Sequence, residues 1–277
     1  MSQRSYRPNH DWSTSSSKTL QSAKEWCKTC EATHEACNKR KSDETPTRLL
    51  DIGSPESTQW RLCFTAEEIN ELVKFIVRSY RWRPQSQALM LSTSTQRPFR
   101  NGLPISELPQ TFKDAIKVAH FLGVLNLWID AVCSFQDSPQ DWEYESKMMS
   151  AVYSNAYCIT AAAASTEPND SLFRKRNPED ILPGLAEVNT KQGDISIRGF
   201  FLLITHKSWQ RELQASVLQS RGWCSQERIL ALRVLHFGER QLSWECGTSV
   251  RNECLVDNFP AVQLAHEKLH FRIAAIS

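Results

Sequence analysis

The sequence predicts an α/β domain with a mostly parallel central sheet flanked by helices, and three observations lead to that prediction. An apolar run over 127–133 is interrupted only by Asp130, as in a strand that is covered on both faces. A helical pattern follows over 138–155, and a second apolar run follows over 157–164. A helix that crosses between two buried strands is the βαβ unit of a parallel sheet.

Local signals indicate where this central helix begins and ends. Ser138 offers an N-cap hydroxyl, Pro139 takes the first helical position, and Asp141 lies three residues after the cap. Asn155 is placed to end the helix. The positions expected to face the core are Trp142, Met149, Val152 and Tyr153. The positions expected to face solvent are Glu143, Glu145 and Lys147.

Composition favours an intracellular protein whose function depends on specific sites. The 277 residues carry 33 basic and 31 acidic side chains, so no bulk charge indicates nucleic acid or a membrane surface as a partner. The nine cysteines are odd in number and scattered, which suits reduced, buried thiols. We find no apolar stretch of membrane-spanning length and no signal-peptide core, so we expect a cytoplasmic protein.

The motifs of common nucleotide-binding folds do not occur. The chain has only nine glycines and contains neither GxGxxG nor GxxxxGK[ST]. This argues against a dinucleotide fold of the usual type and against a P-loop.

The chain divides into four expected parts. Residues 1–21 are polar and serine-rich and are predicted to be a disordered tail, and residues 22–60 form a helical lead-in. Residues 61–254 form the main domain, and residues 255–277 form a C-terminal tail, because the pattern fades after Cys254.

The lead-in contains a possible metal-ligand set. Trp26, Cys27, Cys30, His34 and Cys37 recur on one face of a helix, and three thiols with an imidazole can bind zinc. Side chains spread over three turns of one helix are too far apart for a single tetrahedral ion. We therefore expect an apolar, partly exposed helix face and no metal, with zinc as the alternative.

Further elements are predicted in chain order. An amphipathic or apolar segment over 66–77 leads into residues 79–83, and a helix opens at 108 and ends at Gly123. A polar surface excursion covers 165–193, with a basic triplet at 174–176 that is either solvated surface or a phosphate contact. A strand follows over 195–205, and a C-terminal β-hairpin pairs 232–237 with 241–244.

Three blocks carry a family resemblance. The central block LWIDAVCSFQDSPQDWEYESKMMSAVYSNAYCITAAAA, the block SYRWR at 79–83 and the block SRGWCSQER at 220–228 resemble those of the fungal heterokaryon incompatibility (HET) domain, a cell-death module of non-self recognition. The resemblance spans about residues 30 to 246. In the second block, arginines at 81 and 83 replace the cysteine and glycine of the family pattern, and Arg78 mars the apolar strand that the resemblance implies before it. A degenerate copy is therefore one alternative.

HET domains in turn resemble TIR domains, α/β signalling modules with a flavodoxin-like sheet, some of which cleave NAD. This resemblance implies that Glu227 is catalytic and steadies positive charge on the ribose while the N-glycosidic bond breaks. The residues expected to line the pocket or bind the nucleotide are Ser79, Arg81, Asp130, Asp137, Arg221 and Trp223. NAD(P) would be the substrate, and no cofactor or metal is required.

Structural roles remain open for the same residues. Glu227 could form an ion pair with Arg221 or Arg228, Trp223 could belong to the core, and Asp130 could cap a neighbouring backbone. At the level of function, the alternative is a non-enzymatic module that signals by self-association or by binding a HET-type or NLR-type receptor.

Overall fold

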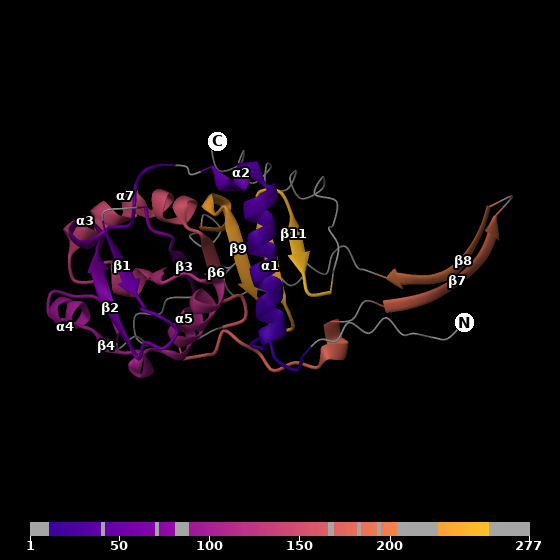
Figure 1. Cartoon of the computed structure of the whole chain (residues 1–277), viewed down its shortest axis with the longest axis horizontal. Helices are drawn as coiled ribbons and strands as arrows, with labels where there is room; N and C mark the ends of the chain where they lie inside the picture. Colours follow the sequence, from indigo (N-terminus) through magenta and orange to yellow (C-terminus); the bar gives the residue numbers. More distant parts are fainter. Residues whose placement is uncertain are drawn as a thin grey trace.

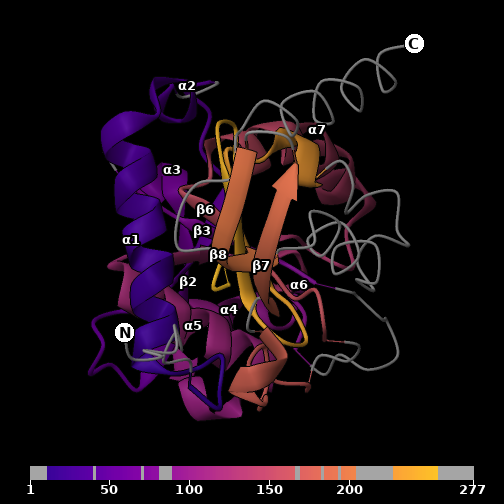
Figure 2. The ribbon, with the colours of Figure 1, turned by 90° about the vertical axis from the view of Figure 1, so that its right-hand side faces the viewer.

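The computed structural model describes residues 11–39, 42–69, 72–80, 89–165, 169–181, 184–192, 195–203 and 227–254. Within them the chain forms a nine-stranded mixed sheet flanked by helices and a separate two-stranded hairpin (Figure 1). Figure 2 shows the helices α1 (Ser17–Thr33) and α7 (Pro139–Asn155) on opposite sides of the large sheet. The α/β class predicted from the sequence is confirmed.

The large sheet has the order β11-β10-β9-β6-β3-β5-β1-β2-β4. Its strands are β1 (Arg48–Asp51), β2 (Gln59–Phe64), β3 (Ile76–Ser79), β4 (Leu103–Pro104), β5 (Asn126–Trp128), β6 (Cys158–Ala161), β9 (Arg233–Phe237), β10 (Leu242–Cys246) and β11 (Val250–Asn252). The pairs β9–β6, β6–β3 and β3–β5 are parallel, and every other pair of the large sheet is antiparallel. The prediction of a mostly parallel sheet is wrong, because antiparallel strands extend the parallel centre on both sides.

The central βαβ unit is present, with one strand inserted between its two strands. Both β5 and β6 pair in parallel with β3, and α7 connects them. The first strand is shorter than predicted, because residues 130–133 form the helical turn α6 (Asp130–Cys133). The Cys133 amide donates to the Ile129 carbonyl at 2.8 Å, which turns the chain out of the sheet at that point.

The predicted ends of α7 are confirmed, whereas the predicted burial of two of its residues is wrong. The Asp141 amide donates to the Ser138 hydroxyl at 3.2 Å, and the helix ends at Asn155. Trp142, expected in the core, is 64% exposed. Glu145, expected in solvent, is 2% exposed because it pairs with Arg48 of β1 at 2.8 Å.

The helix α5 (Gln110–Leu122) matches its prediction closely. Phe112, Ile116 and Ala119 are buried on one face. Gly123 has a φ of 76°, in the left-handed region that a helix-ending residue adopts, and its amide donates to the Ala119 and His120 carbonyls. The shorter helices are α2 (Glu35–Asn38), α3 (Thr65–Glu68), α4 (Gln96–Asn101), and the 3₁₀ turns η2 (Ile105–Glu107) and η3 (Pro178–Ile181).

The N-terminal part is more ordered than the sequence suggests. Helix α1 begins at Ser17, inside the predicted tail, with Ser16 as its N-cap, and β1 and β2 of the large sheet begin within the predicted helical lead-in. Residues 1–10 and the predicted C-terminal tail 255–277 lie outside the described residues.

The predicted surface excursion holds two unexpected features. The strand β7 (Gly184–Gln192) pairs with β8 (Ile195–Leu203), so the hairpin starts before the predicted strand (Figure 1). Arg176 of the basic triplet is not solvated: it is 6% exposed, and its guanidinium donates to Glu253 at 2.7 Å. The C-terminal hairpin formed by β9 and β10 is confirmed.

One hydrophobic core joins α1, α5, α7 and the central strands. Trp60, Trp128 and Trp244 are among its largest fully buried side chains. In the part of the chain that the structure describes, each helix is too short or too polar to cross a bilayer.

Candidate functional site

The carboxyl end of β3 meets the turn that begins at Glu227. Ser79, the last residue of β3, is 5% exposed, and its hydroxyl donates a hydrogen bond to Glu227 Oε2. Glu227 is half-buried and opens a short helical turn, in which the Ala231 amide donates to the Glu227 carbonyl at 3.1 Å. The structure therefore brings together two residues that the sequence placed in one site.

A buried cation lies directly beside this pair. Arg78 is 1% exposed, and its Nη1 donates to the carbonyl oxygens of Ser79 and Thr160, the latter at 3.1 Å. Among the described residues, its Nε and Nη2 have no hydrogen-bond partner. Burial lowers the pKa of Arg78 to about 10, against the opposing charges of Tyr80, Asp114 and Glu227. The guanidinium thus stays charged at neutral pH.

Asp130 lies at the same edge of the sheet. β5 lies next to β3 in parallel and ends at Trp128, and Asp130 opens the helical turn α6 two residues after that carboxyl end. Asp130 is half-buried, and its Oδ1 accepts a hydrogen bond from Ser134 Oγ at 3.1 Å. We call Arg78, Ser79, Asp130 and Glu227 the carboxyl-edge site, because open α/β sheets bind ligands at the carboxyl ends of parallel strands.

An ion pair behind this site anchors the residue next to Glu227. Arg228 donates from Nε and Nη2 to the two carboxylate oxygens of Glu245, at 2.7 and 2.9 Å. Glu245 is 1% exposed on β10, and its Oε2 lies 3.3 Å from His236 Nε2 on β9. Arg228 therefore forms a bidentate ion pair with Glu245, whereas the sequence suggested Glu227 as its partner.

The remaining predicted site residues divide into two groups. Asp137 is exposed and accepts hydrogen bonds from the Thr93 amide and hydroxyl, at 2.9 and 2.7 Å, which lower its pKa. This contact ties the loop before α7 to the loop before α4. Arg81, Arg221 and Trp223 lie outside the described residues.

Sequence reasoning missed the part that Arg78 plays. From the sequence, Arg78 resembles a flaw in the strand before Ser79, although a lone charged residue directly after the apolar run over 75–77 is itself a signal. A charge that is retained in a strand covered on both faces points to a functional or structural partner for it.

One comparison identifies a family. The family model described as heterokaryon incompatibility protein (HET) matches residues 75–227, which is more than half of the chain, and its ends coincide with β3 and Glu227. No curated protein matches the chain. No solved structure matches it either. The match and the three sequence blocks agree, and the chain belongs to the heterokaryon incompatibility (HET) family.

Proposed function

We propose that this chain is a cell-death signalling module of non-self recognition that acts by hydrolysing the N-glycosidic bond of NAD(P). The observation that carries the proposal is the hydrogen bond from Ser79 to Glu227 at the carboxyl edge of the parallel strands. The TIR-like resemblance of the Ser79 and Glu227 blocks supports it, because TIR domains bear a catalytic glutamate in the corresponding block.

The chemistry requires a carboxylate beside the nicotinamide ribose. As the bond between ribose C1′ and the nicotinamide nitrogen breaks, its electron pair leaves with nicotinamide and positive charge develops on the ribose. Glu227 stabilises that charge, and Ser79 fixes one of its oxygens in place. Water then adds at C1′ and releases a proton, so that the products are nicotinamide and ADP-ribose.

The cation in the carboxyl-edge site suits a substrate that carries phosphates. Arg78 has a guanidinium group whose charge is offset by no ion pair within 4.0 Å among the described residues. Its positive charge raises the local potential at the carboxyl ends of β3 and β6, which favours an anionic ligand there. In this proposal Asp130 faces the ribose, and Arg81, Arg221 and Trp223 complete the pocket.

A second candidate function is supported by a different surface. Trp142 and Tyr144, in the first half of α7, are 64% and 55% exposed. Aromatic residues are enriched in protein interfaces. A module that signals by self-association, or by binding a receptor, could use this part of α7 without any chemistry at Glu227.

Expression in a heterologous fungal host separates the two functions. Cell viability and cellular NAD are measured together for the wild type, Glu227→Gln, and the control Glu239→Gln, in which the altered side chain is exposed in the turn between β9 and β10. The proposal predicts death with NAD loss for the wild type and the control, and neither for Glu227→Gln at equal protein level. Killing by Glu227→Gln without NAD loss would establish the scaffold function.

A further inference from the structure

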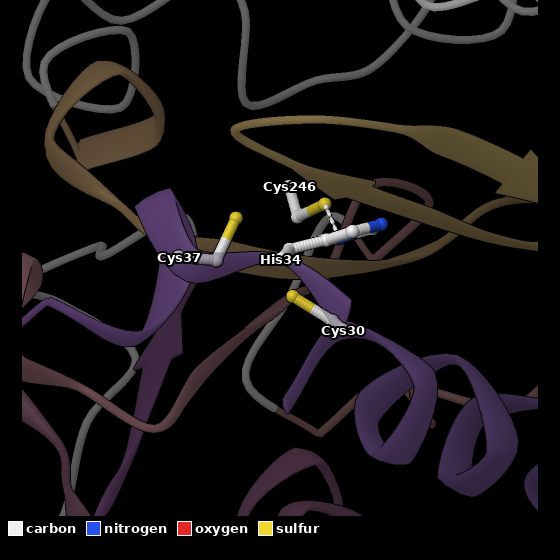
Figure 3. Close-up of side chains that lie close together, drawn as sticks. All are labelled: Cys30, His34, Cys37 and Cys246. Atoms are coloured by element: carbon white, nitrogen blue, oxygen red, sulfur yellow. Dashed lines mark hydrogen bonds between the residues drawn. The ribbon is translucent and has the colours of Figure 1, made fainter. Parts of the chain in front are cut away.

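Three thiols and one imidazole converge where α1, α2 and β10 meet. They belong to Cys30, His34, Cys37 and Cys246, and their ligand atoms all lie within 4.8 Å of one another (Figure 3). The three cysteines are buried and His34 is half-buried. We call these four residues the Cys3His cluster.

A break in the helix brings the first three residues together. Helix α1 ends at Thr33, His34 adopts φ −110° and ψ 85°, and α2 starts in a new direction at Glu35. The expectation of one straight helix with separated side chains is therefore wrong. Cys27, which the sequence grouped with them, lies one turn earlier and is outside the cluster.

The fourth residue comes from the other end of the domain. Cys246 is the last residue of β10, and α1 packs on that strand. Its Sγ lies 3.4 Å from His34 Nδ1. Zinc bonds of about 2.3 Å to sulfur and 2.0–2.1 Å to nitrogen imply tetrahedral edges of about 3.5–3.8 Å, so this separation already approaches that of two ligands on one ion.

The surroundings fit an anionic sulfur centre. The Ser249 amide donates to Cys246 Sγ at 3.3 Å, and Arg233 Nε donates to Cys30 Sγ at 3.3 Å. Three thiolates and a neutral imidazole around Zn²⁺ carry a net charge of −1, which the buried Arg233 guanidinium offsets. Donors to ligand sulfurs of this kind orient a metal site and tune its charge.

The turn after β10 packs closely against Cys37 of the Cys3His cluster. A Cβ atom at Gly247 would lie 3.3 Å from Cys37 Sγ, so glycine lets the backbone approach this sulfur. The same turn supplies Thr248, whose hydroxyl lies 3.7 Å from Cys37 Sγ.

We propose that Cys30, His34, Cys37 and Cys246 bind one structural Zn²⁺. Four protein ligands of the Cys3His type leave no open position for water or substrate, so the ion stabilises the fold and does no chemistry. Soft thiolate ligands in a tetrahedral arrangement favour zinc over magnesium, calcium or manganese.

The ion would connect two segments that flank the HET match at residues 75–227. Residues 30–37 precede it, and Cys246 follows it. Glu245, the neighbour of Cys246 on β10, holds Arg228 next to Glu227. The zinc would thus fix the end of the strand that anchors the turn carrying Glu227.

Metal analysis of the full chain tests the site. Protein is expressed in zinc-supplemented medium and purified with a reductant but without chelator, and its metals are measured by plasma mass spectrometry. About one zinc per chain is expected for the wild type and for Cys27→Ser, a buried thiol of the same helix. Cys37→Ser and Cys246→Ser should lose most of it, whereas His34→Cys should retain it with four thiolates.

Cobalt substitution tests the site without any variant. If the ligand variants fail to fold, Co²⁺ added to zinc-depleted wild type should give the absorption bands of a tetrahedral thiolate complex, and Zn²⁺ should abolish them. Folded wild type that contains no zinc would overturn the proposal. Equal zinc in all variants would also overturn it.

Discussion

Ser79 and Glu227 lie 148 residues apart in the chain, yet the Ser79 hydroxyl donates a hydrogen bond to Glu227 Oε2. The contact joins the first strand of the HET match to its last residue. It is formed at the carboxyl end of a parallel strand, next to the buried cation of Arg78. The enzymatic proposal depends on this relationship.

Replacing Ser79 tests whether this hydrogen bond serves catalysis. Ser79→Ala should lower NAD hydrolysis about 10-fold, because Glu227 loses a donor that orients it, and should cost about 0.5–1.5 kcal/mol of unfolding free energy. Ser154→Ala, which also removes a buried hydroxyl, should leave the rate unchanged. Turnover assays and urea denaturation give the two quantities. Equal rates for the wild type and Ser79→Ala would remove Ser79 from the site.

Replacing Arg78 should weaken the binding of NAD without lowering the stability of the fold. Two of its guanidinium nitrogens have no hydrogen-bond partner among the described residues, so a charge is buried at a cost. Arg78→Met should keep or raise the urea midpoint, because a side chain of similar length fills the space without the charge. It should also raise the KM for NAD at least about 10-fold, since the positive potential that favours an anionic ligand at this edge is lost. A large stability loss with unchanged KM would assign Arg78 a purely structural role.

The bidentate contact between Arg228 and Glu245 should position Glu227. Arg228→Lys keeps the charge but cannot make both hydrogen bonds, so we expect kcat to fall about 10-fold with little change in KM. Arg251→Lys, on the neighbouring strand β11, is the control. If kcat is unchanged, or if KM alone rises, then the ion pair does not act through Glu227.

The ion pair between β1 and α7 should contribute strongly to stability. Arg48 Nη2 lies 2.7 Å from Asp141 and 2.8 Å from Glu145, and Thr47 also donates to Glu145. Burial raises the pKa of Glu145, against the opposing effects of Thr47 and Arg48. Glu145→Ala should lower the free energy of unfolding by about 3–5 kcal/mol, because the buried Arg48 loses one of its two carboxylate partners. Glu143→Ala, which removes an exposed carboxylate, should change stability by less than about 0.5 kcal/mol.

Thermal and denaturant unfolding measure this difference directly. Similar midpoints for Glu145→Ala and Glu143→Ala would mean that the buried network adds nothing to the stability of the fold.

Local patterns in the sequence predicted the centre of the fold well. The cap at Ser138, the helix end at Gly123 and the hairpin before Cys246 are encoded by neighbouring residues, and each is present. The antiparallel strands β1 and β2 were missed, because charged residues such as Arg48 and Arg61 interrupt their apolar pattern. Arg48 is buried there because α7 supplies two carboxylate partners and Cys133 supplies a carbonyl oxygen.

Distant contacts explain what the sequence could not reveal in the sites. The Cys3His cluster needs a helix break at His34 and a fourth ligand 212 residues later, neither of which is visible in the local spacing. Glu227 and Ser79 could be placed together only through family resemblance. Their contact and the neighbouring cation Arg78 emerge when the strands are assembled.

The most direct test of the proposed activity is nicotinamide release from NAD by purified full-length protein at high concentration, with Glu227→Gln and Glu143→Gln measured beside the wild type. We predict release by the wild type and Glu143→Gln, and a loss of at least about 10²-fold in Glu227→Gln, with all three proteins equally folded. Equal release by Glu227→Gln, or none by a folded wild type, would contradict an NAD-cleaving site built on Glu227.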